Sequence, residues 1–106
     1  MVKSTKEVRG TLGFCSFFES LGDTSLKREI SKTLDLLKIN CTIGDKIQHK
    51  LWPKNYIKKY GITNLWRYRL DSNWRLLYHI VGESDGLIVY VIEVLPHSEY
   101  EQRFGY

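Results

Sequence analysis

Three arginines and a histidine in the C-terminal half of the chain have side chains that suit chemistry on a phosphate group. Arg67, Arg69 and Arg75 alternate with aromatic and aliphatic residues in the stretch NLWRYRLDSNWRLLY, and His97 follows further along the chain. A guanidinium group presents a planar fork of donors that matches phosphate oxygens. An imidazole titrates near neutral pH, so it can act as an acid or as a base. The set therefore predicts a site that binds an anion and transfers a proton.

Cleavage of RNA through its ribose 2′-hydroxyl requires this combination of groups. The reaction needs a base for the hydroxyl, an acid for the 5′-oxygen and positive charge on the transition state. We interpret His97 as the acid or base and Arg75 as the group that holds the phosphate. Each has a structural alternative: His97 could cap the last helix, and Arg75 could form a cross-strand ion pair with Glu93. We expect Arg75 to be exposed on the sheet, so that its replacement leaves the fold intact.

The arginines are expected to lie on a β-hairpin between Asn64 and Tyr78. Apolar and charged residues alternate there with a period of two, which is typical of strands with one buried face. The small polar residues Asp71-Ser72-Asn73 form the predicted turn. Arg67 and Arg69 then share one face of the first strand, because successive side chains point to opposite faces. Trp74, beside the turn, could stack on a base.

Two helices are predicted before the hairpin. Apolar residues between Leu26 and Leu37 recur three or four positions apart, after a cap at Asp23 or Thr24. Pro53 is typical of a first helical position, and Gly61 ends the short helix that follows. This second helix carries three lysines beside its tyrosines: Lys54, Lys58 and Lys59.

The remaining segments complete an α+β fold. We expect a strand from roughly Glu7 to Cys15 that passes into a short helical turn through Phe17, Phe18 and Leu21. The run LIVYVIEVL is nearly all β-branched or aromatic, which is typical of a strand covered on both faces. Ser98 and Glu101 have the spacing of a capping box, which predicts a helix to Arg103. Residues 1–106 are thus predicted to form a small single domain. Its antiparallel β-sheet, a three-strand C-terminal meander plus an N-terminal strand, packs against N-terminal helices, with a short C-terminal helix at the end.

Composition and charge restrict the class of protein. Of the 106 residues, 42% are hydrophobic and 26% are charged, as in ordinary globular domains. No apolar run could cross a bilayer and no signal peptide is visible, so we expect a cytoplasmic protein without a membrane partner. The net charge of +4 favours a polyanionic partner such as nucleic acid. The two cysteines show no zinc-site spacing, and the basic region has no carboxylate cluster of the two-metal nuclease type, so neither metal nor cofactor is expected.

The C-terminal half contains three recognisable segments, LWRYRL, WRLLY and HSEY. With these segments, and with its order of elements, the chain resembles the RelE/ParE superfamily of toxins from type II toxin–antitoxin systems. The resemblance is sharpest from about Gly61 to Tyr106 and covers the N-terminal third only in outline. It implies one of two activities: RelE- and YafQ-like members cut messenger RNA on the ribosome, whereas ParE-like members act on DNA gyrase.

The resemblance implies roles for individual residues. Arg75 stands where the RelE branch keeps an arginine that holds the scissile phosphate, and His97 resembles the histidine of the YafQ branch. Arg69 lies on the strand where the RelE branch places basic residues, and Tyr100 lies near a functional tyrosine or phenylalanine of other members. The chain lacks the arginine that RelE itself has just before its C-terminal helix. The residues expected to bind RNA are Arg67, Trp74, Lys54, Lys58 and Lys59.

These features lead to one main hypothesis and two alternatives. The main hypothesis is a metal-independent endoribonuclease, an mRNA interferase that cleaves ribosome-bound messenger by attack of a 2′-hydroxyl on the adjacent phosphate. One alternative is a ParE-like toxin that inhibits DNA gyrase without cutting RNA, and the other is a catalytically silent nucleic-acid-binding module. The resemblance also implies a cognate antitoxin, and an acidic amphipathic segment would complement the charge of this chain.

Overall fold

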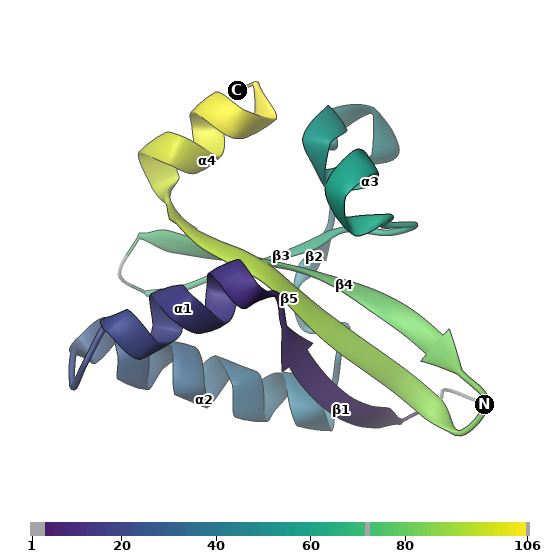
Figure 1. Ribbon diagram of the computed structural model, residues 1–106, viewed down its shortest axis with the longest axis horizontal. Coiled ribbons are helices and arrows are strands. Elements are labelled where there is room, and N and C mark those ends of the chain that lie inside the picture. Colours follow the sequence, from purple (N-terminus) through teal and green to yellow (C-terminus); the bar gives the residue numbers. More distant parts are fainter. Residues whose placement is uncertain (1–3, 72, 106) are drawn as a thin grey trace.

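A five-stranded sheet with helices on both of its faces forms the protein (Figure 1). The computed structural model describes residues 4–71 and 73–105, so Ser72 of the predicted turn lies outside the described residues. The strands, in the spatial order β1-β5-β4-β3-β2, are β1 Thr5–Gly10, β2 Asp45–Lys46, β3 Trp66–Arg69, β4 Trp74–Glu83 and β5 Gly86–Pro96. The helices are α1 Leu12–Ser20, α2 Ser25–Ile39, α3 Lys54–Tyr60 and α4 His97–Phe104, with a 3₁₀ turn η1 at His49–Leu51. None of the described helices is long and apolar enough to span a membrane.

The C-terminal meander that the sequence predicts is confirmed, and so is the α+β class. β3 pairs antiparallel with β4, and β4 pairs antiparallel with β5. β5 lies between β4 and β1, with side chains buried on both of its faces. Its β-branched residues therefore occupy the centre of the sheet, as their pattern indicated.

The N-terminal strand differs from the prediction in direction and in length. β1 pairs parallel with β5, so the sheet is mixed rather than wholly antiparallel. The strand ends at Gly10 and not near Cys15, because the hydroxyl of Thr11 caps a full helix, α1. That hydroxyl accepts a hydrogen bond from the Phe14 amide at 3.1 Å and donates one to the Ile92 carbonyl at 2.7 Å. The two bonds turn the chain from strand to helix and tie the turn to β5.

The two faces of the sheet carry separate hydrophobic cores. Helices α1 and α2 cover one face, and α3 and α4 cover the other (Figure 1). In the first core, Ile30 and Leu37 of α2 pack among the strand residues Leu76, Tyr78, Val89, Val91 and Val94 and against Leu70, which follows β3. In the second core, side chains of α3 and α4 pack among the residues Leu65, Leu77, Ile92 and Leu95. The basic strands are therefore held from both sides.

A β-bulge in β5 decides which side chains face α3 and α4. The register between β4 and β5 shifts after Leu77, and Ile92 is the extra residue. Ile92 packs in the core beneath α3 and α4, while the carboxylate of Glu93 accepts hydrogen bonds from Tyr56 and Arg103. Two successive side chains of β5 thus point to the same face, which a regular strand does not allow.

The ends of α3 and α4 test three local predictions. α3 ends before Gly61, whose positive φ of 59° marks the C-cap, as predicted. Its start differs by one residue, because Pro53 has an extended ψ of 133° and is the N-cap, so the first helical residue is Lys54. The capping box is wrong: α4 begins at His97, Pro96 is its N-cap, and no side chain caps it. Glu101 contacts the His97 ring instead of a backbone amide. The first residue of α4 is therefore the candidate acid or base itself.

Tyr78 fixes the connection between α2 and β2 to the sheet, and its loss should be measurable. Its buried hydroxyl donates to the Cys41 carbonyl at 2.8 Å and accepts from the Gly44 amide at 3.1 Å. Tyr78→Phe leaves both backbone groups without this partner, so we expect unfolding in urea to show a loss of about 2 kcal/mol. The matched control is Tyr68→Phe, because no hydrogen bond to the Tyr68 hydroxyl is found in the described part of the chain; it should change stability by less than about 0.5 kcal/mol. Equal losses in the two variants would contradict this account.

Candidate active site

Three arginines gather on the face of the sheet that α3 and α4 cover. Arg69 lies directly opposite Arg75 in the β3–β4 ladder, and Arg67 lies opposite Leu77. Residues directly opposite each other share a face, and Leu77 is part of the core beneath α3 and α4. The hairpin predicted from the sequence therefore brings all three guanidinium groups to one side.

Arg75 is buried, which contradicts the expectation of an exposed sheet residue. Only 6% of its surface is exposed, because α4 packs over the end of β4 where it lies. Burial lowers the pKa of the Arg75 guanidinium, and the like charges of Arg69 and then Arg67 lower it further. One guanidinium nitrogen donates to the Trp74 carbonyl at 3.2 Å. A buried cation beside two others is a ready site for an anion, because an anion would relieve the repulsion.

His97 meets Arg75, as predicted from the antiparallel order of the strands. The second terminal nitrogen of Arg75 lies 3.0 Å from His97 Nδ1, and His97 Nε2 contacts a carboxylate oxygen of Glu101. The His97 amide also donates to the Asn73 carbonyl at 3.0 Å, which holds the start of α4 against the β3–β4 turn. Both ring nitrogens therefore have polar partners, and one of these partners is the predicted phosphate-binding arginine.

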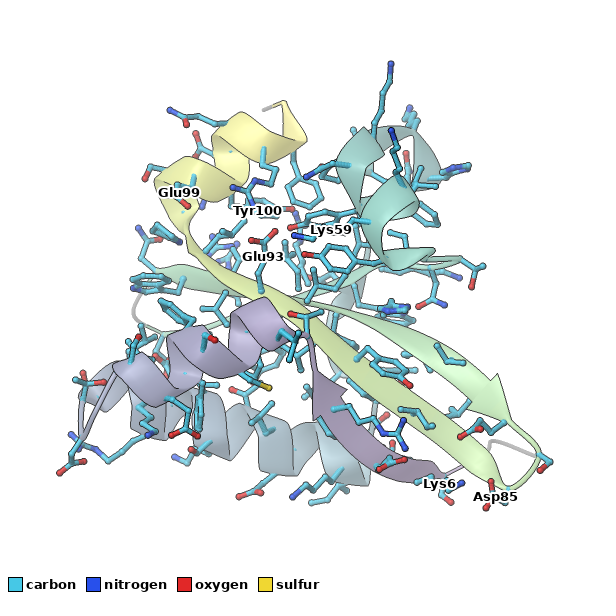
Figure 2. All side chains as sticks on the ribbon, viewed as in Figure 1. Lys6, Lys59, Asp85, Glu93, Glu99 and Tyr100 are labelled. Atoms are coloured by element: carbon cyan, nitrogen blue, oxygen red, sulfur yellow. The ribbon has the colours of Figure 1, made fainter. Side chains whose placement is uncertain are left out.

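Glu93 does not pair with Arg75, so the structural alternative for that arginine is wrong. Its carboxylate accepts from Arg103 at 2.6 Å and from the Tyr56 hydroxyl. Figure 2 shows Glu93 in the region between α3 and α4, near Tyr100. The bond to Glu93 raises the pKa of Arg103, and burial together with the same carboxylate raises the pKa of Tyr56. This cluster joins α3, β5 and α4 and leaves the Arg75 guanidinium directed at His97.

Tyr100 lies beneath the site and contacts two of its members. The residue is only 1% exposed, and its hydroxyl accepts a hydrogen bond from Arg67 at 2.7 Å. Its ring is stacked near that of His97, with centroids 6.5 Å apart. Arg67 also forms an ion pair with Asp45 at 3.8 Å. In this geometry Tyr100 orients Arg67 and supports the His97 ring.

The other candidate residues lie further from Arg75. The lysines of α3 are exposed on the same side of the sheet: Lys54, Lys58 and Lys59. Trp74 precedes Arg75 on β4 and therefore points to the opposite face. Its ring packs against Phe17 of α1, with centroids 5.9 Å apart. The geometry thus places the lysines, but not Trp74, on the side of the arginines.

The sequence analysis missed the contact between Glu101 and the candidate histidine. Residues four positions apart on a helix are neighbours on its surface, so His97 and Glu101 meet once α4 begins at His97. The capping pattern of the sequence predicts a helix that begins at Ser98, which leaves His97 outside it. Their spacing of four positions is the feature of the sequence that could have predicted this contact.

Together the residues provide the components for cleavage at a phosphate. Arg75, Arg69 and Arg67 supply positive charge, and His97 supplies a group that can move a proton. The Arg75–His97 distance of 3.0 Å means that a phosphate bound to the arginine would lie within reach of the imidazole.

Comparisons with known proteins agree with the predicted fold. No family model matches the sequence, and no curated protein matches it significantly. Among solved structures, a YoeB/ParE toxin from Agrobacterium tumefaciens is similar, with a TM-score of 0.60 over 86% of this chain and 98% of that chain. The two sequences are 15% identical, so the likeness establishes a common fold. The predicted α+β fold is therefore one that this chain shares with a solved toxin structure.

The surroundings of Arg75 and Arg103 predict opposite effects on stability. Arg75 is a buried cation beside like charges, so Arg75→Met should stabilise the protein by about 1 kcal/mol, and by less at high salt, which screens the repulsion. Arg103 is held by Glu93, so Arg103→Met should destabilise the protein by about 1 kcal/mol. Urea unfolding at low and high salt measures both changes. A loss of stability in Arg75→Met as large as that in Arg103→Met would mean that Arg75 is a structural residue.

Proposed function

We propose that the protein is the toxin of a type II toxin–antitoxin system and acts as an endoribonuclease on messenger RNA. The single observation that carries this proposal is the juxtaposition of Arg75 and His97, with 3.0 Å between guanidinium and imidazole nitrogens. An exposed arginine cluster alone would suit any anion. A buried arginine in contact with a partly exposed histidine can bind an anion and move a proton beside it. The phosphodiester of RNA fits this pair, because the oxygens next to its phosphate gain and lose protons during cleavage.

In the proposed reaction, the ribose 2′-hydroxyl attacks the adjacent phosphorus and the 5′-oxygen leaves. Arg75 holds the non-bridging phosphate oxygens, and the charge of Arg69 beside it stabilises the transition state. His97 transfers a proton at the reacting oxygens. Tyr100 keeps Arg67 in place through its hydroxyl. These side chains supply the positive charge and the proton transfer, so the proposed reaction needs no metal ion.

The surroundings of the site fit a single-stranded substrate. Lys54, Lys58 and Lys59 are exposed on α3, on the same side of the sheet as the arginines. We infer that they attract the RNA backbone and that the ribosome presents the messenger, as the RelE/ParE resemblance implies. Loss of one lysine should weaken binding without stopping the reaction.

The proposed partners and location follow from the same reading. A cognate antitoxin would cover the basic face, and an acidic segment would complement a chain whose net charge is +4. With a messenger substrate and such an antitoxin, the protein would act in the cytoplasm.

Cleavage of a defined messenger on translating ribosomes tests the proposal. The wild type should cut the messenger, Arg75→Ala should abolish the cuts, and His97→Gln should slow them by about 10²- to 10⁴-fold. Arg28→Ala is the matched control, because Arg28 is an exposed arginine paired with Asp23 beside α2, on the far side of the sheet. It should cut like the wild type.

Parallel assays separate the two alternative activities. Intact messenger together with inhibited supercoiling by DNA gyrase would overturn the proposal in favour of a ParE-like activity. RNA binding without cleavage or gyrase inhibition would indicate a silent binding module. Either result contradicts the endoribonuclease assignment.

A further inference from the structure

The His97 ring lies between a group that only donates hydrogen bonds and a group that accepts them. Nδ1 is 3.0 Å from an Arg75 nitrogen, and Nε2 contacts the Glu101 carboxylate. We infer that Glu101 is a positioning residue that fixes the tautomer of His97 and makes this histidine the general base of the cleavage reaction. The inference rests on the proposed function and assigns the direction in which His97 moves its proton.

The tautomer follows from the chemistry of the two partners. A guanidinium has no acceptor, so His97 Nδ1 must present its lone pair to Arg75. The proton of the neutral ring is then on Nε2, where the Glu101 carboxylate accepts it. His97 and Glu101 are four positions apart at the start of α4, so the backbone of the helix holds the pair in register.

This tautomer prepares the ring to take a proton and not to give one. The lone pair of Nδ1 is on the side of Arg75, where the phosphate is proposed to bind. A phosphate that takes up the Arg75 donor leaves Nδ1 free to accept the proton of the neighbouring 2′-hydroxyl. The 2′-oxygen then forms a bond to phosphorus, the bond from phosphorus to the 5′-oxygen breaks, and solvent water protonates the leaving oxygen. His97 returns its proton to solvent afterwards.

The charges around the ring explain why a carboxylate is needed there. From β4, the Arg75 guanidinium lies 3.0 Å from the ring, and Arg67 and Arg69 lie on the neighbouring strand β3, where Arg67 pairs with Asp45 of β2. From α4, Glu101 favours the proton, and the neutral Tyr100 ring stacks below. Glu93 is engaged by Arg103 and Tyr56. Without Glu101, the imidazolium that forms during the attack would lie against the Arg75 guanidinium with no carboxylate in contact with it.

A merely structural pair makes different predictions. A surface pair at this helical spacing adds only slightly to helix stability and leaves the proton transfer unaffected. A positioning role instead links Glu101 to the pH dependence of cleavage, because the carboxylate favours the protonated ring. The direction of that dependence separates base from acid: a general base gives a rate that rises with pH, and a general acid gives a rate that falls.

The first measurement is NMR of ¹⁵N-histidine-labelled wild-type protein without RNA, at a pH where the imidazoles are neutral. The nitrogen shifts of His97 should report a proton on Nε2 and none on Nδ1. A ring protonated on Nδ1 would overturn the inference, whatever the protein does to RNA.

The second measurement is the single-turnover rate of messenger cleavage on ribosomes as a function of pH. The wild-type rate should rise through neutral pH. Glu101→Gln should cut at about one-fifth to one-tenth of the wild-type rate at high pH and move the rising part of the profile to lower pH. Glu99→Gln is the matched control, since Glu99 is an exposed glutamate on the first turn of α4 and makes no contact with the His97 ring among the described residues; its profile should match the wild type.

The outcomes separate this inference from the proposed function. A wild-type rate that falls with pH makes His97 an acid and overturns the inference while cleavage stands. A Glu101→Gln profile that is lowered but not moved makes the pair structural and also overturns it. No cleavage by the wild type overturns the proposed function, and the base assignment fails with it.

Discussion

The antiparallel pairing of β4 with β5 is the constraint on which the rest of the site depends. Its register places Pro96 opposite Trp74, so the chain leaves β5 beside the residue that precedes Arg75. α4 begins at the next residue, and the His97 amide binds the Asn73 carbonyl at 3.0 Å. A shift of one residue would send Arg75 to the other face of the sheet, away from His97. The bulge at Ile92 adds a second side chain of β5, next to Glu93, to the face that α3 and α4 cover.

Like charges lie close together at the site, which raises the electrostatic free energy of the folded protein. Arg75 is buried beside Arg69 and Arg67, and its lowered pKa records that the surroundings disfavour its charge. Hydrogen bonds to the Trp74 carbonyl and to His97 offset part of this cost. Arg103, by contrast, forms an ion pair with Glu93 at 2.6 Å. Clusters of like charge that persist in a folded protein are typical of sites that bind an oppositely charged ligand.

The sequence predicted the parts of the fold that local pattern determines. Alternation identified the β3–β4 hairpin, the apolar run identified the central strand, and the two together predicted that His97 would meet Arg75. Local pattern does not determine the direction of β1 or the burial of Arg75, because both depend on contacts between distant segments. β1 pairs parallel with β5, and Arg75 is covered because α4 packs over it. The Glu101 contact was missed for a smaller reason: the helix begins one residue earlier than its capping pattern indicated.

The chemistry of the RNA ends tests the central claim most directly. If the 2′-hydroxyl attacks the phosphate held by Arg75, the upstream fragment must end in a 2′,3′-cyclic phosphate and the downstream fragment must begin with a 5′-hydroxyl. A messenger with a 2′-methoxy group at the cut position should remain whole, because it has no nucleophile. Fragments with 3′-hydroxyl and 5′-phosphate ends, or cleavage of the 2′-methoxy messenger, would contradict the account.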